Sequence, residues 1–286
     1  MSERERDQET GTETTGHEWD GIKELDTPLP RWWLWTFYAT IVWGLGYTIA
    51  YPAWPMITEA TSGALGYSSR AELSAIIEAH KASNAQVDDR IAAASFEDIR
   101  SDADLDSYAQ SGGAAVFRTY CSQCHGAGAA GAVGYPNLID DDWLWGGTEE
   151  EIAMTVRYGI RWETEDESRF SEMPAFGADE ILVQAEIEAI VAHVQSLSDK
   201  ADPNADGAAL YADNCAACHG DEGLGDHDLG APNLADAIWL YGGDAETLYE
   251  TIYYSRAGAM PPWHDRLSES EIKQVSHYVH NLGGGE

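Results

Sequence analysis

Positive charge is scarce in this chain of 286 residues, which has 16 Lys and Arg against 50 Asp and Glu and a net charge of −34. Such a surface repels nucleic acids and anionic lipid headgroups, so the sequence excludes nucleic-acid binding. The acidic excess leaves two interpretations open: attraction of a cationic partner, or a solvated surface adapted to high salt. Hydrophobic residues make up 44% of the chain, which excludes an entirely disordered protein.

Cysteine is also rare, and its four residues all lie in two Cys-x-x-Cys-His motifs (Cys121, Cys124 and His125; Cys215, Cys218 and His219). This motif is the attachment sequence of c-type haem, in which two thiols bond to the porphyrin and the His ligates the iron. The sequence therefore predicts two covalently bound haem c groups. A zinc site built from both cysteine pairs, or a redox dithiol, is the weaker interpretation, because each motif has its own downstream unit and a dithiol needs no adjacent His.

The two motifs belong to a tandem repeat. Residues 136–138 and 143–147 (Pro-Asn-Leu and Trp-Leu-Trp-Gly-Gly) match residues 232–234 and 239–243 (Pro-Asn-Leu and Trp-Leu-Tyr-Gly-Gly), 96 residues later. Each copy ends in a Met-Pro pair and then a segment with the apolar spacing of an amphipathic helix. We therefore predict an all-α fold with two class I cytochrome c-like domains, over residues 107–199 and 205–286.

A low-spin haem electron carrier needs a second axial ligand, which in cytochromes c is a methionine thioether. Met173 and Met260 stand in the two Met-Pro pairs, each between two predicted helices, and we predict that they complete the iron coordination begun by His125 and His219. The competing interpretation is two ordinary packing methionines. Whether each Met ligates the iron of its own domain or of the other domain stays open. The other seven histidines lack such a motif, and those in the closing helices are expected to pack or face solvent.

Residues 32–51 contain no charged side chain, and aromatic residues stand at both ends of this segment. As a helix it would span about 30 Å, roughly the hydrocarbon thickness of a bilayer. We predict a transmembrane helix over residues 32–55. A core helix of this length would normally carry a charge on one face, and a cleaved signal peptide has a shorter apolar core after a basic rather than an acidic segment. Residues 1–31 are expected to form a mostly disordered cytoplasmic tail, and residues 56–106 a flexible spacer with one short helix near Ser69. Because c-type haem is attached outside the cytoplasm, this single-pass chain would place its haem domains in the periplasm.

The sequence resembles the dihaem subunit (subunit III) of cbb3-type cytochrome c oxidase. The segments that carry the resemblance are Asp20–Leu25 and Pro28–Trp33 before the uncharged segment, Leu65–Arg70 after it, and Tyr158–Arg161 and Met173–Gly177 in the first haem domain. It covers the chain from about residue 20 to the C-terminus. The segment before the membrane is the specific part, since tandem haem domains alone fit several families.

This resemblance implies an electron-transfer subunit of a terminal oxidase in the bacterial inner membrane. It would take electrons from a donor cytochrome c and pass them through a monohaem subunit to the catalytic haem–copper subunit, which reduces oxygen and pumps protons. In that assembly the chain would be a non-catalytic subunit, and whether it is an enzyme in isolation stays open. A free-standing membrane-anchored dihaem carrier is the alternative, and a dihaem peroxidase is a third, weaker one.

Overall fold

A computed structural model describes residues 5–198 and 205–285 of the protein. The chain divides into two compact units, residues 1–83 and residues 84–286. The first unit contains strands β1 (Thr14–Trp19) and β2 (Ile22–Leu25) and helix α1 (Arg31–Ala50). Helix α2 (Ser69–Ala93) continues from the first unit into the second.

Strands β1 and β2 form an antiparallel hairpin in which Trp19 pairs with Ile22 and Thr14 with Leu25. Asp20 and Gly21 form its two-residue turn, and both have positive φ angles, of 48° and 83°. This is the backbone that a tight hairpin turn requires and that Asp-Gly adopts readily. The expectation of a disordered tail is therefore wrong for residues 14–25, and the all-helical expectation holds only outside this hairpin.

Helix α1 covers the uncharged segment, and none of its side chains is buried within the chain. Among the described residues, no helix combines the length and the apolar character needed to cross a membrane.

The spacer is more ordered than its composition indicated. Helix α2 begins at Ser69 as predicted but runs for 25 residues, and α3 (Phe96–Ser101) follows it with a capping box between Ser95 and Asp98. Ile91, Phe96 and Ile99 are almost fully buried. The expectation of a flexible spacer is therefore wrong at its C-terminal end, because this stretch supplies apolar side chains to the core of the second unit.

The second unit has a repeated succession of short helices. In order these are α4 (Ala103–Val116), the π-helical turn η1 (Phe117–Cys121), α5 (Ser122–His125), α6 (Glu149–Tyr158), α7 (Gln184–Leu197), α8 (Ala205–Asn214), α9 (Ala216–His219), α10 (Ala245–Tyr254) and α11 (Glu269–His280). Capping boxes start α6 at Thr148 and α11 at Ser268, where each side chain and the Glu three residues later satisfy backbone N–H groups.

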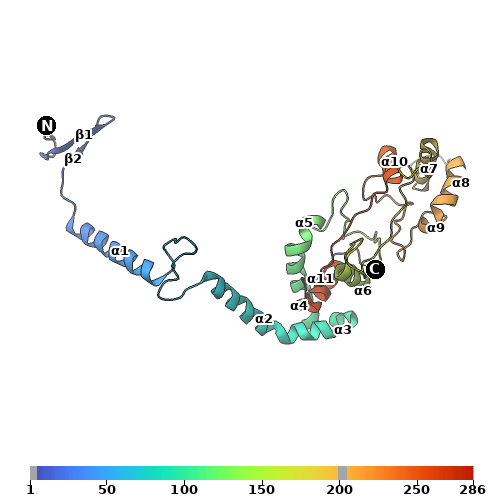
Figure 1. Ribbon diagram of the computed structural model, residues 1–286, viewed down its shortest axis with the longest axis horizontal. Helices are drawn as coiled ribbons and strands as arrows, with labels where there is room; N and C mark the ends of the chain where they lie inside the picture. The colour runs from blue at the N-terminus through green and yellow to red at the C-terminus, as the bar shows by residue number, and fades with distance from the viewer. Residues whose placement is uncertain (1–4, 199–204, 286) are drawn as a thin grey trace. The chain divides into compact units, whose positions relative to one another are not determined.

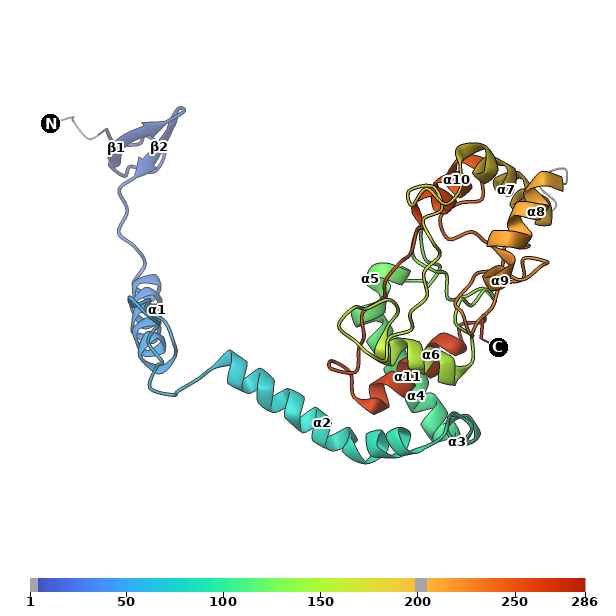
Figure 2. The ribbon, with the colours of Figure 1, turned by 45° about the vertical axis from the view of Figure 1, so that its right-hand side comes forward.

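The helices of the second unit gather into two groups, with long loops between them (Figures 1 and 2). Helices α4, α6 and α11 enclose one core together with the end of α2 and α3, and helices α7, α8 and α10 enclose the other. Each group combines helices from both sequence repeats. The closing helix of the second repeat, α11, packs on α4 and α6, and the closing helix of the first repeat, α7, packs on α8 and α10.

The closing helices α7 and α11 are thus exchanged between the repeats, and glycines at matching positions of the two repeats permit this packing. A Cβ on Gly113 of α4 would lie 2.1 Å from the Gln274 carbonyl oxygen of α11. A Cβ on Gly207 of α8, 94 residues later, would lie 2.0 Å from the Ala189 carbonyl oxygen of α7. Glycine weakens a helix by about 1 kcal/mol relative to Ala, and here it allows two helix backbones to meet without a side chain between them.

Candidate haem-binding sites

The first motif lies where η1 meets α5. Cys121 ends η1, and Cys124 and His125 occupy the single turn of α5, so both thiols and the imidazole come from about two turns of helix. The His125 Nδ1 lies 3.1 Å from the Pro136 carbonyl oxygen. Since a carbonyl can only accept, Nδ1 carries the proton and Nε2 keeps its lone pair, as an iron-ligating imidazole requires.

The second motif repeats this arrangement. Cys215 precedes α9, which contains Cys218 and His219, and the His219 Nδ1 donates to the Pro232 carbonyl oxygen at 3.0 Å. The two accepting carbonyls belong to the repeated Pro-Asn-Leu segments, so the repeat has a structural purpose: it fixes the tautomer of each histidine. Burial lowers the pKa of both His125 and His219, which favours the neutral form that binds metal.

The four cysteines are free thiols in the structure. Burial raises the pKa of Cys121 and of Cys215 to about 11, so these sulfurs are protonated at neutral pH and are poor redox dithiols. Among the residues that the structure describes, no three His, Cys, Asp or Glu side chains come together as a metal site. The geometry therefore gives no support to the zinc interpretation.

Both motifs open onto one continuous cavity of about 760 Å³. Its lining is mainly apolar and aromatic and includes both histidines, all four cysteines and both predicted methionines. The indole N–H of Trp145 lines this cavity and is buried, yet it has no hydrogen-bond partner among the described residues. A large apolar cavity with four cysteine thiols, two oriented imidazoles and an unpaired buried donor fits haem, whose macrocycle is apolar and whose propionates accept hydrogen bonds.

Each of the two methionines packs against the same hydrophobic core as the first cysteine of the other repeat's motif. Met260 packs in the core that contains Cys121, and its backbone pairs with Ile160 through hydrogen bonds of 2.9 and 3.0 Å. Gly159 makes this approach possible: its φ is 73°, and a Cβ there would lie 2.3 Å from the Met260 carbonyl oxygen.

Met173 shows the reciprocal arrangement. It packs in the core that contains Cys215, and its carbonyl oxygen accepts a hydrogen bond from the Ser255 hydroxyl. The Gly177 N–H donates to the Tyr253 carbonyl oxygen at 3.2 Å, which fixes the same loop against the second repeat. In each repeat, the methionine and the closing helix therefore pack in the same core, which also contains a cysteine of the other repeat's motif.

The aromatic-Gly-Gly segments, residues 143–147 and 239–243, accept hydrogen bonds from the exchanged closing helices. The His280 ring of α11 contacts the Gly147 carbonyl oxygen at 3.1 Å through Nδ1. At the matching positions, the Gln195 side chain of α7 donates to the Gly243 carbonyl oxygen at 3.2 Å. The two aromatic-Gly-Gly segments therefore have a structural role.

One closing-helix histidine is more than a packing residue. His277 is fully buried, its Nδ1 lies 2.6 Å from a Glu149 carboxylate oxygen, and its Nε2 lies 2.8 Å from an Asp106 carboxylate oxygen. Arg100 forms an ion pair with the other oxygen of Glu149. No local sequence pattern predicts this cluster, because its members come from α3, α4, α6 and α11.

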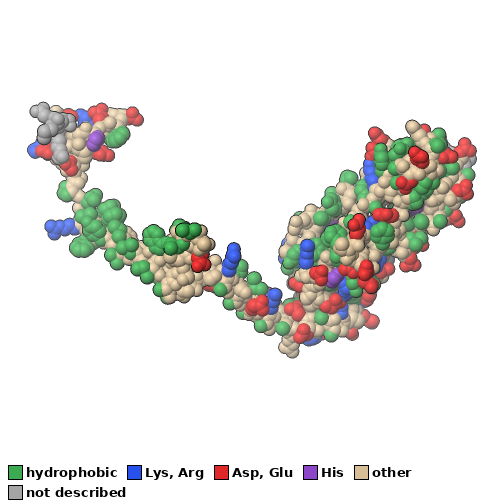
Figure 3. Space-filling view, in the orientation of Figure 1, with side chains coloured by type: hydrophobic (Ala, Val, Ile, Leu, Met, Phe, Trp, Pro, Cys, Tyr) green, Lys and Arg blue, Asp and Glu red, His purple; other side chains and the backbone are tan. Residues whose placement is uncertain are grey.

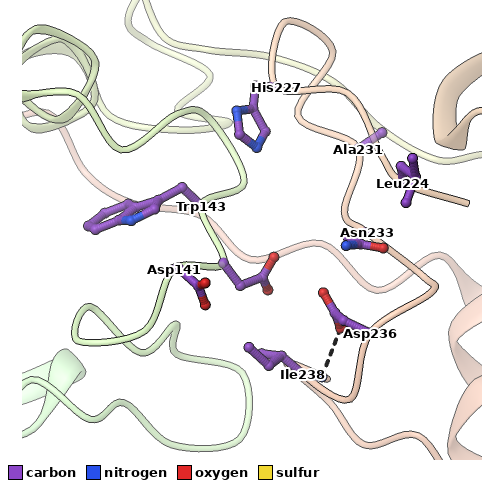
Figure 4. Close-up of a pocket in the computed structure, with 9 residues that line it drawn as sticks. Asp141, Trp143, Leu224, His227, Ala231, Asn233, Asp236 and Ile238 are labelled. Atoms are coloured by element: carbon purple, nitrogen blue, oxygen red, sulfur yellow. Dashed lines mark hydrogen bonds between the residues drawn. The ribbon is translucent and has the colours of Figure 1, made fainter. Parts of the chain in front are cut away.

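A second, smaller pocket of about 250 Å³ lies among acidic side chains of the haem unit (Figure 4). Asp141, Asp236 and His227 surround it, and Asp236 accepts a hydrogen bond of 2.8 Å from the Ile238 N–H. Asp142 also lines it, and burial, together with the nearby carboxylate of Asp236, raises the pKa of Asp142 to about 6. Acidic side chains are also scattered over the visible surface of this unit, where they outnumber the basic ones (Figure 3).

Comparisons with known proteins agree with this geometry over both units. The profile of the N-terminal domain of cytochrome oxidase-cbb3, FixP, matches residues 11–58, and that of cytochrome c oxidase, cbb3-type, subunit III, matches residues 109–194 and 202–279. The cbb3-type cytochrome c oxidase subunit CcoP of Cereibacter sphaeroides is 56% identical over 96% of this chain and 95% of its own length.

Two further relatives show the same extent of similarity. The FixP subunit of Sinorhizobium medicae is 50% identical over 98% of this chain and 97% of its own length. The CcoP subunit of Rhodobacter capsulatus is 48% identical over 96% of each chain. With two matching profiles and full-length relatives at about half identity, this chain belongs to the subunit III family of cbb3-type cytochrome c oxidases.

Proposed function

We propose that this protein is the dihaem electron-transfer subunit of a cbb3-type terminal oxidase. It takes electrons from a donor cytochrome c and passes them, through the monohaem subunit, to the catalytic haem–copper subunit. The observation that carries the proposal is the single cavity onto which two oriented Cys-x-x-Cys-His motifs and two methionines open. Full-length similarity to named oxidase subunits favours this function over a free-standing carrier.

The residues would hold two haem c groups in the following way. Cys121 and Cys124 would bond to one porphyrin, and Cys215 and Cys218 to the other. When bound, each haem supplies an iron that carries one electron. The apolar lining of the cavity would keep water from the iron, and Met173 and Met260, as second ligands, would leave no open position for oxygen or peroxide. The chain would therefore transfer electrons without reducing oxygen itself.

We further propose that the axial methionines are exchanged between the repeats. Met260 would complete the coordination of the iron bound by His125, and Met173 that of the iron bound by His219. The support is that Met260 shares a hydrophobic core with Cys121, and Met173 shares the other core with Cys215. The backbone ladder between Ile160 and Met260 would hold the first of these ligands in place.

A pair of variants tests the exchange. Met260→Leu should lower the potential of one haem, since a thioether ligand raises it, and should change the electron paramagnetic resonance signal that a His125→Ala variant also changes. Met173→Leu should change the signal that a His219→Ala variant changes. Met154→Leu is the control, because Met154 is exposed on α6 and should alter neither haem. The opposite pairing of signals would refute the exchange.

We also propose that α1 anchors the chain in the bacterial inner membrane, with the N-terminus in the cytoplasm and the haem unit in the periplasm. Helix α1 has no charged residue after Arg31, and large apolar side chains such as Trp35, Trp43 and Ile49 are exposed along it. Aromatic side chains of this kind suit the two interfaces of a bilayer. Protease treatment of intact spheroplasts should remove the haem unit and spare a tag fused to the N-terminus.

The oxidase assignment is tested by purification of the protein from its native membrane in a mild detergent. We expect the chain to elute with a haem–copper subunit and a second c-type cytochrome. Elution of the dihaem chain alone, with both haems intact, would support the free-standing carrier instead.

A further inference from the structure

The Arg161 side chain joins the two loops that carry the methionines. Its Nε donates to the Ser171 carbonyl oxygen at 2.6 Å, and its Nη1 donates to the Gly258 carbonyl oxygen at 3.0 Å. Ser171 stands two residues before Met173, and Gly258 stands two residues before Met260. The guanidinium therefore lies between equivalent positions of the two repeats, and it lines the haem cavity.

Among the described residues, Arg161 and the adjacent Arg169 donate to carbonyl oxygens rather than to carboxylates, which distinguishes both from two other arginines nearby. Arg256, the other arginine that lines the cavity, forms an ion pair with Glu250, and Arg157 on α6 forms one with Glu269. In the part of the chain that the structure describes, no carboxylate forms an ion pair with Arg161. This is notable in a chain with 50 acidic residues.

The partly buried guanidinium of Arg161 also has N–H donors that make no hydrogen bond to the described residues. Two of its five N–H groups are accounted for by the two carbonyls, which carry only partial charge. Burial lowers the pKa of Arg161, which reflects the cost of holding this cation away from water. A desolvated cation with free donors is stabilised by an anion in bidentate contact.

The backbone at Arg161 is unusual as well. Its φ is 51°, in the left-handed region that residues other than Gly seldom adopt. Such a conformation costs about 1 kcal/mol or more and tends to occur at binding sites. Here it follows directly on Ile160, whose backbone pairs with Met260. The strained backbone at Arg161 therefore lies at the point where its side chain meets the loops of Met173 and Met260.

We propose that Arg161 binds a propionate carboxylate of a haem in this cavity and, by its positive charge, raises the reduction potential of that haem. A cation stabilises the reduced form, which carries one more negative charge than the oxidised form. At about 10 Å and an effective dielectric constant of about 20, one charge changes a one-electron equilibrium by roughly tenfold. This inference rests on the proposed dihaem function and adds the residue that would set the potential.

The test is a spectroelectrochemical titration of the full-length haem-loaded protein in detergent. Arg161→Gln should lower the potential of at least one haem by the equivalent of about tenfold in its reduction equilibrium, or about 59 mV for one electron. Arg161→Lys keeps the charge and should restore most of this loss. Arg70→Gln removes a charge from an exposed position on α2, in the first unit, and serves as the control, with both potentials close to those of the unmodified protein.

The outcomes separate charge from a merely mechanical role. If Arg161 only fastens the two loops, Lys would fail as Gln does, and the charge-transfer band of the Met–iron bond would weaken in both variants. That result would overturn the proposal, as would unchanged potentials in Arg161→Gln. The unmodified protein reports separately on the dihaem function, because a titration with two low-spin c-type haems would stand whatever the variants show.

Discussion

Replacement of Asp142 by Asn should stabilise the folded protein at neutral pH. The pKa of Asp142 is raised to about 6 from an ordinary value of 3.8, chiefly because burial penalises its charged form. The carboxylates of Asp236, Asp140 and Asp141 raise it further, and His227 acts in the opposite direction. At neutral pH the folded protein therefore holds a carboxylate where a neutral group would be more stable.

The size of the effect follows from the linkage between protonation and folding. A pKa difference of about two units corresponds to about 3 kcal/mol for a fully buried group. Asp142 is only partly buried, so we reduce this to about 1.5 kcal/mol to allow for solvent screening. Because the folded-state pKa is raised, the penalty is absent below about pH 4, grows as the pH rises to about 6 and is complete above that.

Urea unfolding of the haem-loaded protein, followed by far-ultraviolet circular dichroism, measures this gain. Asp142→Asn should raise the free energy of unfolding by about 1.5 kcal/mol at pH 7.5 and by about half as much at pH 5. Asp141→Asn makes the same change of net charge at an exposed neighbour and corrects for general repulsion. An equal gain from both variants, or a gain that does not shrink between pH 7.5 and pH 5, would show that burial of Asp142 is not its cause.

Two further predictions concern the helix exchange and the buried ion cluster. Glu149→Gln should lower the free energy of unfolding by about 2 kcal/mol, because a neutral amide would replace the buried carboxylate that contacts the His277 Nδ1 and pairs with Arg100, whereas Glu150→Gln at the exposed next position should have little effect in the same urea titration. A chain that ends at residue 199 keeps Cys121 and His125 but lacks Met260 and α11, so its haem should be high-spin and bind carbon monoxide, which optical spectra would show; a low-spin spectrum from this shortened chain would contradict the exchange.

The chemistry of the sites could be predicted from the sequence because it depends on short spacings. The Cys-x-x-Cys-His motif fits within a turn or two of helix, and the amphipathic segments that became α6, α7 and α11 have the expected period. The signal for the hairpin is equally local, since it is the Asp20-Gly21 turn, whereas the polar composition around it favours disorder.

The pairing of the elements could not be predicted in the same way. The apolar faces of α7 and α11 are alike, so each could close either repeat, and a local pattern does not distinguish a partner 90 residues away from a nearer one. The difference lies in particular contacts, such as the Gln274 carbonyl oxygen against Gly113 and the His277 ring between Asp106 and Glu149. These contacts join residues far apart in sequence, and only the folded chain brings them together.

The exchange has a consequence for electron transfer that separate domains would not share. In an unexchanged pair, the two haem units could shift against each other while each kept its own ligands. Here the backbone of Met260 forms hydrogen bonds with that of Ile160, and the Met173 carbonyl oxygen accepts one from the Ser255 hydroxyl. The contacts between the repeats are therefore also the contacts that would position the ligands. Relative movement of the repeats would disturb the proposed coordination itself. In the proposed coordination, the hydrogen bonds between the repeats would also hold the two methionine ligands in place, so they would limit movement of one haem site relative to the other.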